Sequence, residues 1–333
     1  MITHADRRHH DGRHEWLMAK GLWPMAWEGR APARPDELEL VPPVIAYGFF
    51  ERLTNNKKGK TMSEPLKMLL WPNGAPGAKG DAVEDKPDLT LYMPENYDVS
   101  KPRGLVVVLP GGGYHFKAAH EGEPIAKMLN AAGIPAVVVQ YRVSPYRYPI
   151  PAEDARRAIR LVRYHAAEWH IDPNHVGILG FSAGGHCAAT ASTIFESTVL
   201  NPNDPVDKQS SRPDAFVSCY SVITFGFKRH DGSMHCLLDD ANGKVDPKMQ
   251  EYLSLEYRVT PQTPPTFMWT TFADELVPVE NTLYFANALR ANNVPFELHI
   301  FPAGHHGLGL AIGNPIVSQW ADLCTKWLAA QGF

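Results

Sequence analysis

Residues 176–185 read Val-Gly-Ile-Leu-Gly-Phe-Ser-Ala-Gly-Gly and join an apolar run to a run of small residues. The pattern G-x-S-x-G spans the junction, with its serine at position 182. This order predicts a strand over 176–181, a sharp turn at Ser182 and a helix over 183–194. A serine in such a strained turn projects its hydroxyl into a site, and glycines at 180 and 184 keep Cβ atoms out of the turn. Ser182 is therefore the candidate nucleophile; the alternative is an ordinary N-cap serine in a Gly-rich turn.

Strands and helices alternate in the same way along most of the chain. Continuous apolar runs, such as Leu-Val-Val-Val-Leu at 105–109, are typical of buried parallel strands. Apolar residues recur at helical spacing over 152–169, with arginines between them. This alternation predicts an α/β fold, with a mostly parallel central sheet and helices on both faces. The other predicted strands are 89–92, 136–140, 265–272 and 296–301, and the other predicted helices are 121–132, 279–292 and 319–330.

Two segments depart from this rhythm. Residues 195–260 interrupt the alternation, and we expect them to include a lid or loop insertion in an α/β domain that spans 62–333. Residues 1–61 show no clean helix or strand period, and their Trp and Pro residues are scattered. They are either a poorly ordered N-terminal extension or the product of a start assigned upstream of Met62. The codons of Lys-Gly-Lys at 58–60 can form a purine-rich stretch like a ribosome-binding site, which favours the second hypothesis.

Three glycines follow the predicted strand 105–109, in the sequence Pro-Gly-Gly-Gly-Tyr at 110–114. Glycine lets the backbone bend until successive N–H groups face one point. Such donors stabilise the negative charge that develops on a carbonyl oxygen when a nucleophile attacks it. We assign this oxyanion-hole role to the N–H groups of Gly112, Gly113 and Ala183. A phosphate-binding loop is the alternative, but neither G-x-G-x-x-G nor G-K-[ST] is completed here.

A serine hydroxyl is a weak nucleophile at neutral pH and needs an adjacent base. His306 is the candidate, because it lies in the loop after the predicted strand 296–301 and Gly307 behind it lets that loop bend. His305 is its rival. Two adjacent histidines also raise the question of a metal site, but no cluster of carboxylates stands near them in the sequence.

The base in turn needs an acid that orients its imidazole ring. Asp274 is the candidate, because it closes the predicted strand 265–272. Glu275 is its rival, and a plain carboxylate at a helix N-terminus is the other explanation. The order Ser182, Asp274, His306 differs from that of the chymotrypsin and subtilisin triads.

Composition excludes several classes of function. The formal net charge is −4, from 32 Lys+Arg against 36 Asp+Glu, and no basic block stands out, so we expect no nucleic-acid partner. We find no secretory signal, and the apolar run at 40–50 is interrupted by two prolines and is shorter than the ~20 residues that span a bilayer. The four cysteines form no CxxC pair and match no zinc spacing. We therefore expect no metal, no cofactor and a cytoplasmic protein with free thiols.

These motifs in combination resemble the α/β-hydrolase esterases of the acetyl-xylan-esterase-like and feruloyl-esterase-like family, relatives of the hormone-sensitive-lipase group. The resemblance covers residues 69–333. It is carried by Trp-Pro at 71–72, Ala-Pro-Gly at 75–77, Leu-Tyr-Met-Pro at 91–94, Pro-Gly-Gly-Gly-Tyr at 110–114, Tyr-Arg at 141–142, Gly-Phe-Ser-Ala-Gly-Gly at 180–185, Pro-Pro-Thr-Phe at 264–267 and Gly-His-His-Gly-Leu-Gly-Leu at 304–310.

The resemblance implies an activity. It implies a serine carboxylesterase that removes small acyl groups, with acetylated sugars or xylo-oligosaccharides as substrates, and it favours His306 over His305 as the base. Two departures from the family pattern bear on the acyl and alcohol preference. Pro110 stands where lipase-group members have His before the three glycines, and His305 stands where Gly or Pro is more usual.

Tyr114 and His186 are the candidate substrate-binding residues, and His115, Phe116 and Tyr220 are further pocket-lining candidates.

Two other functions fit parts of the pattern. A peptidase related to prolyl oligopeptidases is one, but 333 residues leave no room for the propeller domain that those enzymes usually carry. The second alternative function is that of a non-catalytic binding protein on a hydrolase scaffold. The intact set of candidate nucleophile, base, acid and glycines argues against it.

Overall fold

An eight-stranded sheet forms the centre of the structure, a computed structural model that describes residues 65–195 and 201–333. The strand order is β1-β2-β4-β3-β5-β6-β7-β8. β2 is antiparallel to both of its neighbours, and every pair from β4 to β8 is parallel. The predicted mostly parallel sheet is therefore confirmed. The strands are β1 (Leu66–Leu69), β2 (Asp88–Tyr92), β3 (Arg103–Leu109), β4 (Ala136–Gln140), β5 (Ile171–Phe181), β6 (Ala215–Cys219), β7 (Thr266–Thr271) and β8 (Phe296–Phe301).

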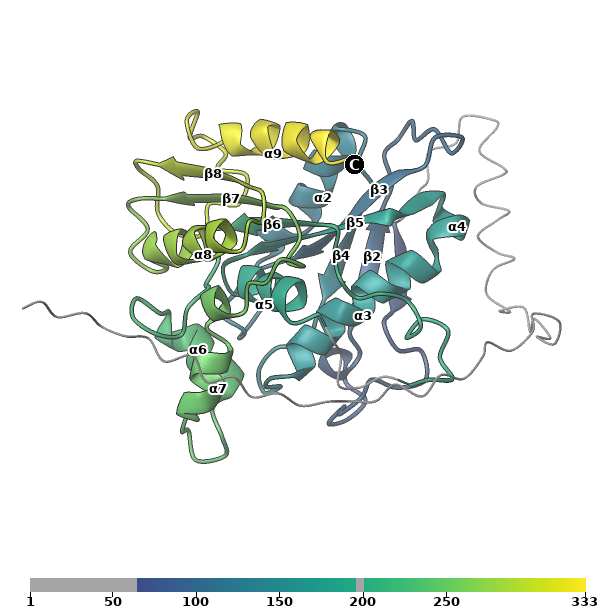
Figure 1. Cartoon of the computed structure of the whole chain (residues 1–333). Helices are drawn as coiled ribbons and strands as arrows, with labels where there is room; N and C mark the ends of the chain where they lie inside the picture. The colour runs from purple at the N-terminus through teal and green to yellow at the C-terminus, as the bar shows by residue number, and fades with distance from the viewer. Residues whose placement is uncertain (1–64, 196–200) are drawn as a thin grey trace, which may run out of the picture. The chain divides into compact units, whose positions relative to one another are not determined.

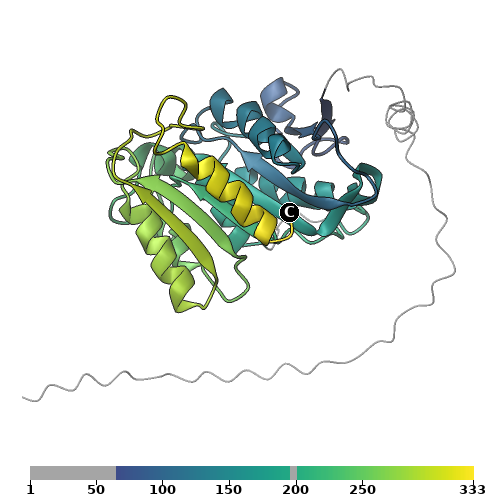
Figure 2. The same ribbon diagram turned by 90° about the horizontal axis from the view of Figure 1, so that it is seen from above.

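Helices cover both faces of this sheet (Figures 1 and 2). α2 and α9 lie on one face, and α3, α5 and α8 lie on the other. This arrangement follows from the parallel strands, because each crossover between them carries its helix across a face of the sheet. The helices are α2 (Glu123–Ala131), α3 (Ile150–Tyr164), α4 (Ala166–Trp169), α5 (Ser182–Thr193), α6 (Asp231–Leu238), α7 (Pro247–Tyr252), α8 (Glu280–Ala291) and α9 (Gln319–Ala330), with short 3-10 turns η2 (Val83–Asp85), η3 (Ala119–Glu121) and η4 (Leu255–Tyr257).

The segment 195–260 contains one strand of the sheet as well as a part that departs from the strand–helix alternation. β6 lies inside it, pairs with β5 and β7, and has all five residues buried. The part of this segment that departs from the strand–helix alternation contains α6, α7 and η4. The lid or loop insertion expected within 195–260 stays a prediction. Residues 1–61 lie outside the described residues, so the two hypotheses about them also stay predictions.

Three arginines of the amphipathic helix α3 are buried: Arg156, Arg157 and Arg160. Arg157 and Arg160 are 3% and 5% exposed. Arg157 forms an ion pair with Asp207 at 2.8 Å, and Arg160 donates to Ser211 Oγ at 3.0 Å. The segment between α5 and β6 covers this side of α3, and the arginines bind it by hydrogen bonds and ion pairs rather than by apolar packing.

No helix in residues 65–195 or 201–333 combines the length and the hydropathy that a bilayer crossing requires.

Trp320 of α9 joins the core to the loop that carries His306. Its ring stacks on Trp269 of β7, with centroids 4.9 Å apart and planes at 18°, and it meets Phe181 of β5 edge-on at 6.0 Å. The indole Nε1 donates to the carbonyl oxygen of Gly309 at 3.0 Å. Trp320 is fully buried, so its packing and its hydrogen bond both contribute to stability.

Trp320→Ala is expected to lower the free energy of unfolding by about 3–5 kcal/mol, because it leaves a large cavity and an unpaired carbonyl group. Trp320→Phe keeps most of the apolar contact and should cost clearly less. Urea unfolding followed by tryptophan fluorescence and circular dichroism measures both values. A loss below about 1 kcal/mol for the Ala variant would contradict this account of the core.

Candidate active site

Ser182 lies at the sharp junction of β5 and α5. Its φ angle is +51°, a left-handed backbone conformation that is strained for a side chain of this kind. The glycines on either side allow this geometry: a Cβ at Gly180 would overlap the carbonyl oxygen of Gly184, and a Cβ at Gly184 would overlap those of Leu109 and Pro110. The turn therefore packs directly against the loop that follows β3.

A chain of hydrogen bonds joins Ser182, His306 and Asp274. His306 Nε2 lies 2.8 Å from Ser182 Oγ, and His306 Nδ1 lies 2.7 Å from Asp274 Oδ2. The rival residues are placed elsewhere: the Nδ1 atom of His305 lies 2.7 Å from the carbonyl oxygen of His306, and Glu275 is exposed. Of the alternatives left open by the sequence, the structure brings His306 and Asp274 to the serine.

The Asp274 carboxylate is fixed on its other side by the backbone. Oδ1 accepts the N–H groups of Leu276 at 3.0 Å and Val277 at 2.9 Å, and the residue is 4% exposed. Since an ionised carboxylate can only accept, the hydrogen between Asp274 and His306 belongs to Nδ1 of the imidazole. This leaves the lone pair of Nε2 directed at the hydroxyl of Ser182, which is the arrangement required for general-base action.

The glycine loop after β3 lines the same cavity as Ser182. Gly112 and Gly113 have φ angles of +128° and +64°, and the carbonyl of Gly112 accepts the amides of His115 and Phe116. Within the described residues, no turn or loop hydrogen bond uses the N–H groups of Gly112 or Gly113. These two groups and the N–H of Ala183 remain the proposed oxyanion donors.

Comparison with known proteins identifies the family. The BD-FAE family model matches residues 89–289. The chain belongs to the BD-FAE family. A similar solved structure is that of an acetyl ester-xyloside bifunctional hydrolase from Caldicellulosiruptor lactoaceticus. It is 45% identical to this chain, with a TM-score of 0.74, and the match covers 80% of this chain and 96% of that one.

Two curated relatives extend the comparison of this BD-FAE chain. Endo-1,4-beta-xylanase B of Butyrivibrio fibrisolvens is 38% identical over 241 residues, which is 71% of this chain and 36% of that protein. Acetylxylan esterase of Xylanibacter ruminicola is 34% identical over 250 residues, or 74% of this chain and 48% of that protein. The chain thus matches between about a third and about half of the length of these relatives.

A cavity of about 670 Å³ opens over Ser182 and His306 in this BD-FAE domain. His115 and Phe116 line it, as the sequence suggested. The sequence did not identify several other lining residues, because they come from segments that are far apart in the chain. These are His120 from η3, His230, Gly232 and Cys236 from α6 and the turn before it, and Leu276 from the loop after β7.

Tyr114 and His186 do not line this cavity, and their assignment as substrate-binding residues is corrected. Both are buried, at 1% and 0% exposure, and the Tyr114 hydroxyl lies 2.9 Å from His186 Nδ1. His186 Nε2 donates to the carbonyl of Leu253 at 2.9 Å, so Nδ1 is the acceptor for Tyr114. Tyr220 is buried as well. A residue next to a site motif in sequence can point into the core, as these three do.

Glu121 connects the glycine loop to the loop that carries His306. It is 2% exposed. Oε2 accepts the N–H of Gly111 at 2.7 Å, and Oε1 accepts the Tyr220 hydroxyl at 2.6 Å. The Tyr220 oxygen accepts the N–H of Gly309 at 2.9 Å, and the Tyr220 ring meets the imidazole of His306 edge-on at 5.0 Å. One buried carboxylate thus holds both the oxyanion loop and the support of the base.

His230 places a second imidazole at the cavity. Its Nδ1 accepts the backbone N–H of Ser233 at 3.1 Å, so the ring hydrogen is on Nε2. Burial, and then the neighbouring His306, lower the pKa of His230. His230 thus adds an imidazole ring to the lining of the site. In residues 65–195 and 201–333, no three His, Cys, Asp or Glu side chains converge in a way that could hold a metal ion.

Glu121→Gln is expected to slow the labelling of Ser182 by an organophosphonate by roughly 10- to 100-fold. An amide has one acceptor oxygen, so its NH₂ group must face either the amide of Gly111 or the hydroxyl of Tyr220, and a buried donor left unpaired costs about 1–3 kcal/mol. Mass spectrometry over time measures the labelling rate, and circular dichroism checks the fold.

Glu123→Gln is the matched control, because this carboxylate is 53% exposed and pairs only with Lys127 within its own helix. Its labelling rate should stay within twofold of the parent rate. Equal rates for the Glu121 and Glu123 variants would show that Glu121 does not position the site.

Because of His186, the free energy of unfolding should decrease as the pH is lowered. Burial lowers its pKa from 6.5 to about 4, so the folded state excludes a proton that the unfolded state binds below pH 6.5. Stability is then lost as the pH falls from 6.5 to 4, by at most about 1.4 kcal/mol per pH unit. His186→Gln removes this titration, so its curve of unfolding free energy against pH should be flatter than the parent curve in this window. Parallel curves would contradict the prediction.

Proposed function

We propose that this chain is a serine carboxylesterase that removes short acyl groups, acetyl above all, from hydroxyls of acetylated sugars such as xylo-oligosaccharides. The observation that carries the proposal is the hydrogen-bonded chain from Ser182 through His306 to Asp274, at a cavity that Gly112 and Gly113 also line. The printed names of two relatives, an acetylxylan esterase and an acetyl ester-xyloside hydrolase, support the acetyl and xylose chemistry.

The first half of the proposed reaction forms an acyl-enzyme. Ser182 Oγ attacks the ester carbonyl carbon while His306 Nε2 takes the hydroxyl proton, and the π electrons of the carbonyl move to its oxygen. The amides of Gly112, Gly113 and Ala183 stabilise that oxyanion, and Asp274 stabilises the imidazolium. The tetrahedral intermediate then breaks its bond to the alcohol oxygen, which receives the proton from His306 and leaves.

Water completes the reaction along the same route. His306 takes a proton from a water molecule as that water attacks the acyl carbon, and the oxyanion forms again at the same amides. Collapse breaks the bond to Ser182 Oγ, which regains its proton from His306. The carboxylic acid leaves, and the site returns to its starting state.

The lining of the cavity suits a hydroxyl-rich alcohol. His115, His120 and His230 supply ring nitrogens around the opening, and Phe116 and Leu276 supply apolar surface, with 58% and 51% of their areas exposed. A sugar ring presents both hydroxyls and C–H faces, so it can use both kinds of surface. The volume of about 670 Å³ is within the range of small-ligand sites and much larger than an acetyl group needs. Action in the cytoplasm stays a prediction.

Ser182→Ala is expected to lower kcat for p-nitrophenyl acetate by roughly 10⁴-fold or more, because the nucleophile is lost while the fold remains. His306→Ala should cause a similar loss. His305→Ala is the matched control, since this neighbouring histidine makes no contact with Ser182, and it should retain most of the activity. Near-parent activity of the Ser182 variant would refute the assignment.

A substrate panel tests the acyl and alcohol preference. We expect kcat/KM to fall from p-nitrophenyl acetate through butyrate to octanoate, and we expect acetate release from acetylated xylo-oligosaccharides. Proline-containing anilides should not be cleaved, which separates an esterase from a prolyl-oligopeptidase-like peptidase. A preference for octanoate, or cleavage of the anilides, would contradict the proposal.

A further inference from the structure

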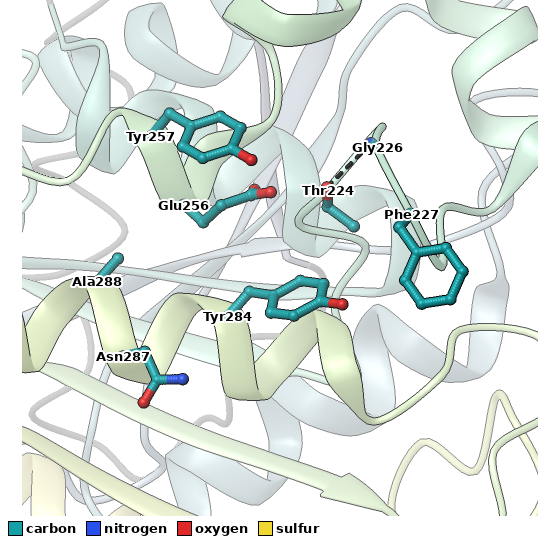
Figure 3. A pocket seen from close by; sticks show the side chains of 8 residues that line it. All are labelled: Thr224, Gly226, Phe227, Glu256, Tyr257, Tyr284, Asn287 and Ala288. Atoms are coloured by element: carbon teal, nitrogen blue, oxygen red, sulfur yellow. Dashed lines mark hydrogen bonds between the residues drawn. The ribbon is translucent and has the colours of Figure 1, made fainter. Parts of the chain in front are cut away.

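A second cavity, of about 440 Å³, lies between η4, α8 and the loop that follows β6 (Figure 3). Phe227 comes from the loop, Glu256 and Tyr257 come from η4, and Tyr284 and Asn287 come from α8. Neither Ser182 nor His306 lines it. We propose that this cavity is an accessory site that binds a xylopyranose unit of an oligosaccharide; this inference rests on the proposed function and names a second place where its substrate is held.

Aromatic rings surround the opening. Phe227 and Tyr257 have 75% and 64% of their surface exposed, and the ring of Tyr284 lies below that of Tyr257 in the view of Figure 3. Large exposed aromatics gathered at one hollow mark a binding surface more often than single exposed residues do. Pyranose rings carry C–H groups on their faces, and these pack well against aromatic rings.

Glu256 provides the polar group at the centre of the cavity. Figure 3 shows its carboxylate directed between the rings of Tyr257 and Tyr284, on the side of Thr224. Its Oε2 atom is shielded from solvent and has no hydrogen-bond partner among the described residues. Burial raises the pKa of this carboxyl group. Because the Glu256 side chain lines the cavity, its carboxylate is a candidate acceptor for a sugar hydroxyl there.

The set of polar groups favours a sugar over an organic cation. Aromatic rings around a carboxylate can also hold a quaternary ammonium group. However, the Asn287 amide and the tyrosine hydroxyls at this cavity offer donors as well as acceptors, and a quaternary ammonium ion can use neither. A pyranose uses all of these groups, because each hydroxyl both donates and accepts.

One loop forms part of both cavities. Gly226 and Phe227 line the second cavity, and His230 lines the catalytic one. The buried Asn281 side chain fixes this loop on α8: its Oδ1 accepts the N–H groups at positions 223 and 224, and its Nδ2 donates to the carbonyl of Lys228 at 2.9 Å. One loop, fixed on α8 by Asn281, thus contributes to the walls of both cavities.

Binding of unacetylated xylotriose tests the proposal. The probe is titrated by calorimetry into the full chain whose Ser182 has been capped with an organophosphonate, so that binding at the catalytic cavity is hindered. Saturable binding should remain. Glu256→Gln and Tyr257→Ala should each weaken it at least fivefold. Tyr164→Ala is the matched control, because this tyrosine on α3 is also exposed, at 38%, and lines neither cavity.

Three results would overturn the inference: no saturable binding of xylotriose, equal affinity in the Glu256, Tyr257 and Tyr164 variants, or tighter binding of tetramethylammonium than of xylotriose at this cavity. The proposed function is judged separately, by hydrolysis of p-nitrophenyl acetate in the uncapped protein. If the chain hydrolyses the ester but does not bind xylotriose, only the proposal of an accessory site is contradicted. If the chain binds xylotriose but hydrolyses no ester, only the esterase proposal is contradicted.

Discussion

The site depends on one close approach of two backbones. The turn at Gly184 packs against the carbonyl groups of Leu109 and Pro110, at a distance that excludes a Cβ atom. The same restriction holds at Gly111, where a Cβ would lie 3.0 Å from that of Ser182. Because β3 and β5 are adjacent parallel strands, their carboxyl ends bring the serine turn and the glycine loop to the same edge of the sheet. The serine turn and the glycine loop thus become neighbours through the packing of the backbone itself.

Buried polar groups then hold the loops that this packing leaves free. Glu121 and Tyr220 join the glycine loop to the loop after β8, and two backbone amides fix Asp274. A site held in this way is preorganised, since its dipoles need not turn when charge develops on the substrate. Hydrogen bonds at such low exposure are also costly to break, because the groups left behind cannot reach water. Positional accuracy at Ser182 therefore rests on buried side chains around the site.

Local sequence patterns predicted those parts of the fold that are local in origin. The strands at 136–140 and 296–301 and the helix at 319–330 match β4, β8 and α9, and the glycine pattern at 180–184 located the turn. Parts that depend on distant contacts were missed. β6 is a five-residue strand whose identity comes from its neighbours β5 and β7. The local pattern did not predict the burial of the α3 arginines, because the segment that covers them lies about fifty positions away in the chain. The burial of Tyr114 and His186, and the place of His230 at the cavity, were hidden for the same reason.

The described structure narrows where motion near the site can occur. β6 lies within the sheet, and Asn281 fixes the loop after it on α8, so this wall of both cavities is rigidly supported. α6 buries Ser233, Met234 and Leu237, whereas α7 buries no residue at all. Segments with few buried contacts open at low free-energy cost. Any lid movement should therefore centre on α7 and the turn before it, while His230, at the start of α6, keeps its place beside His306.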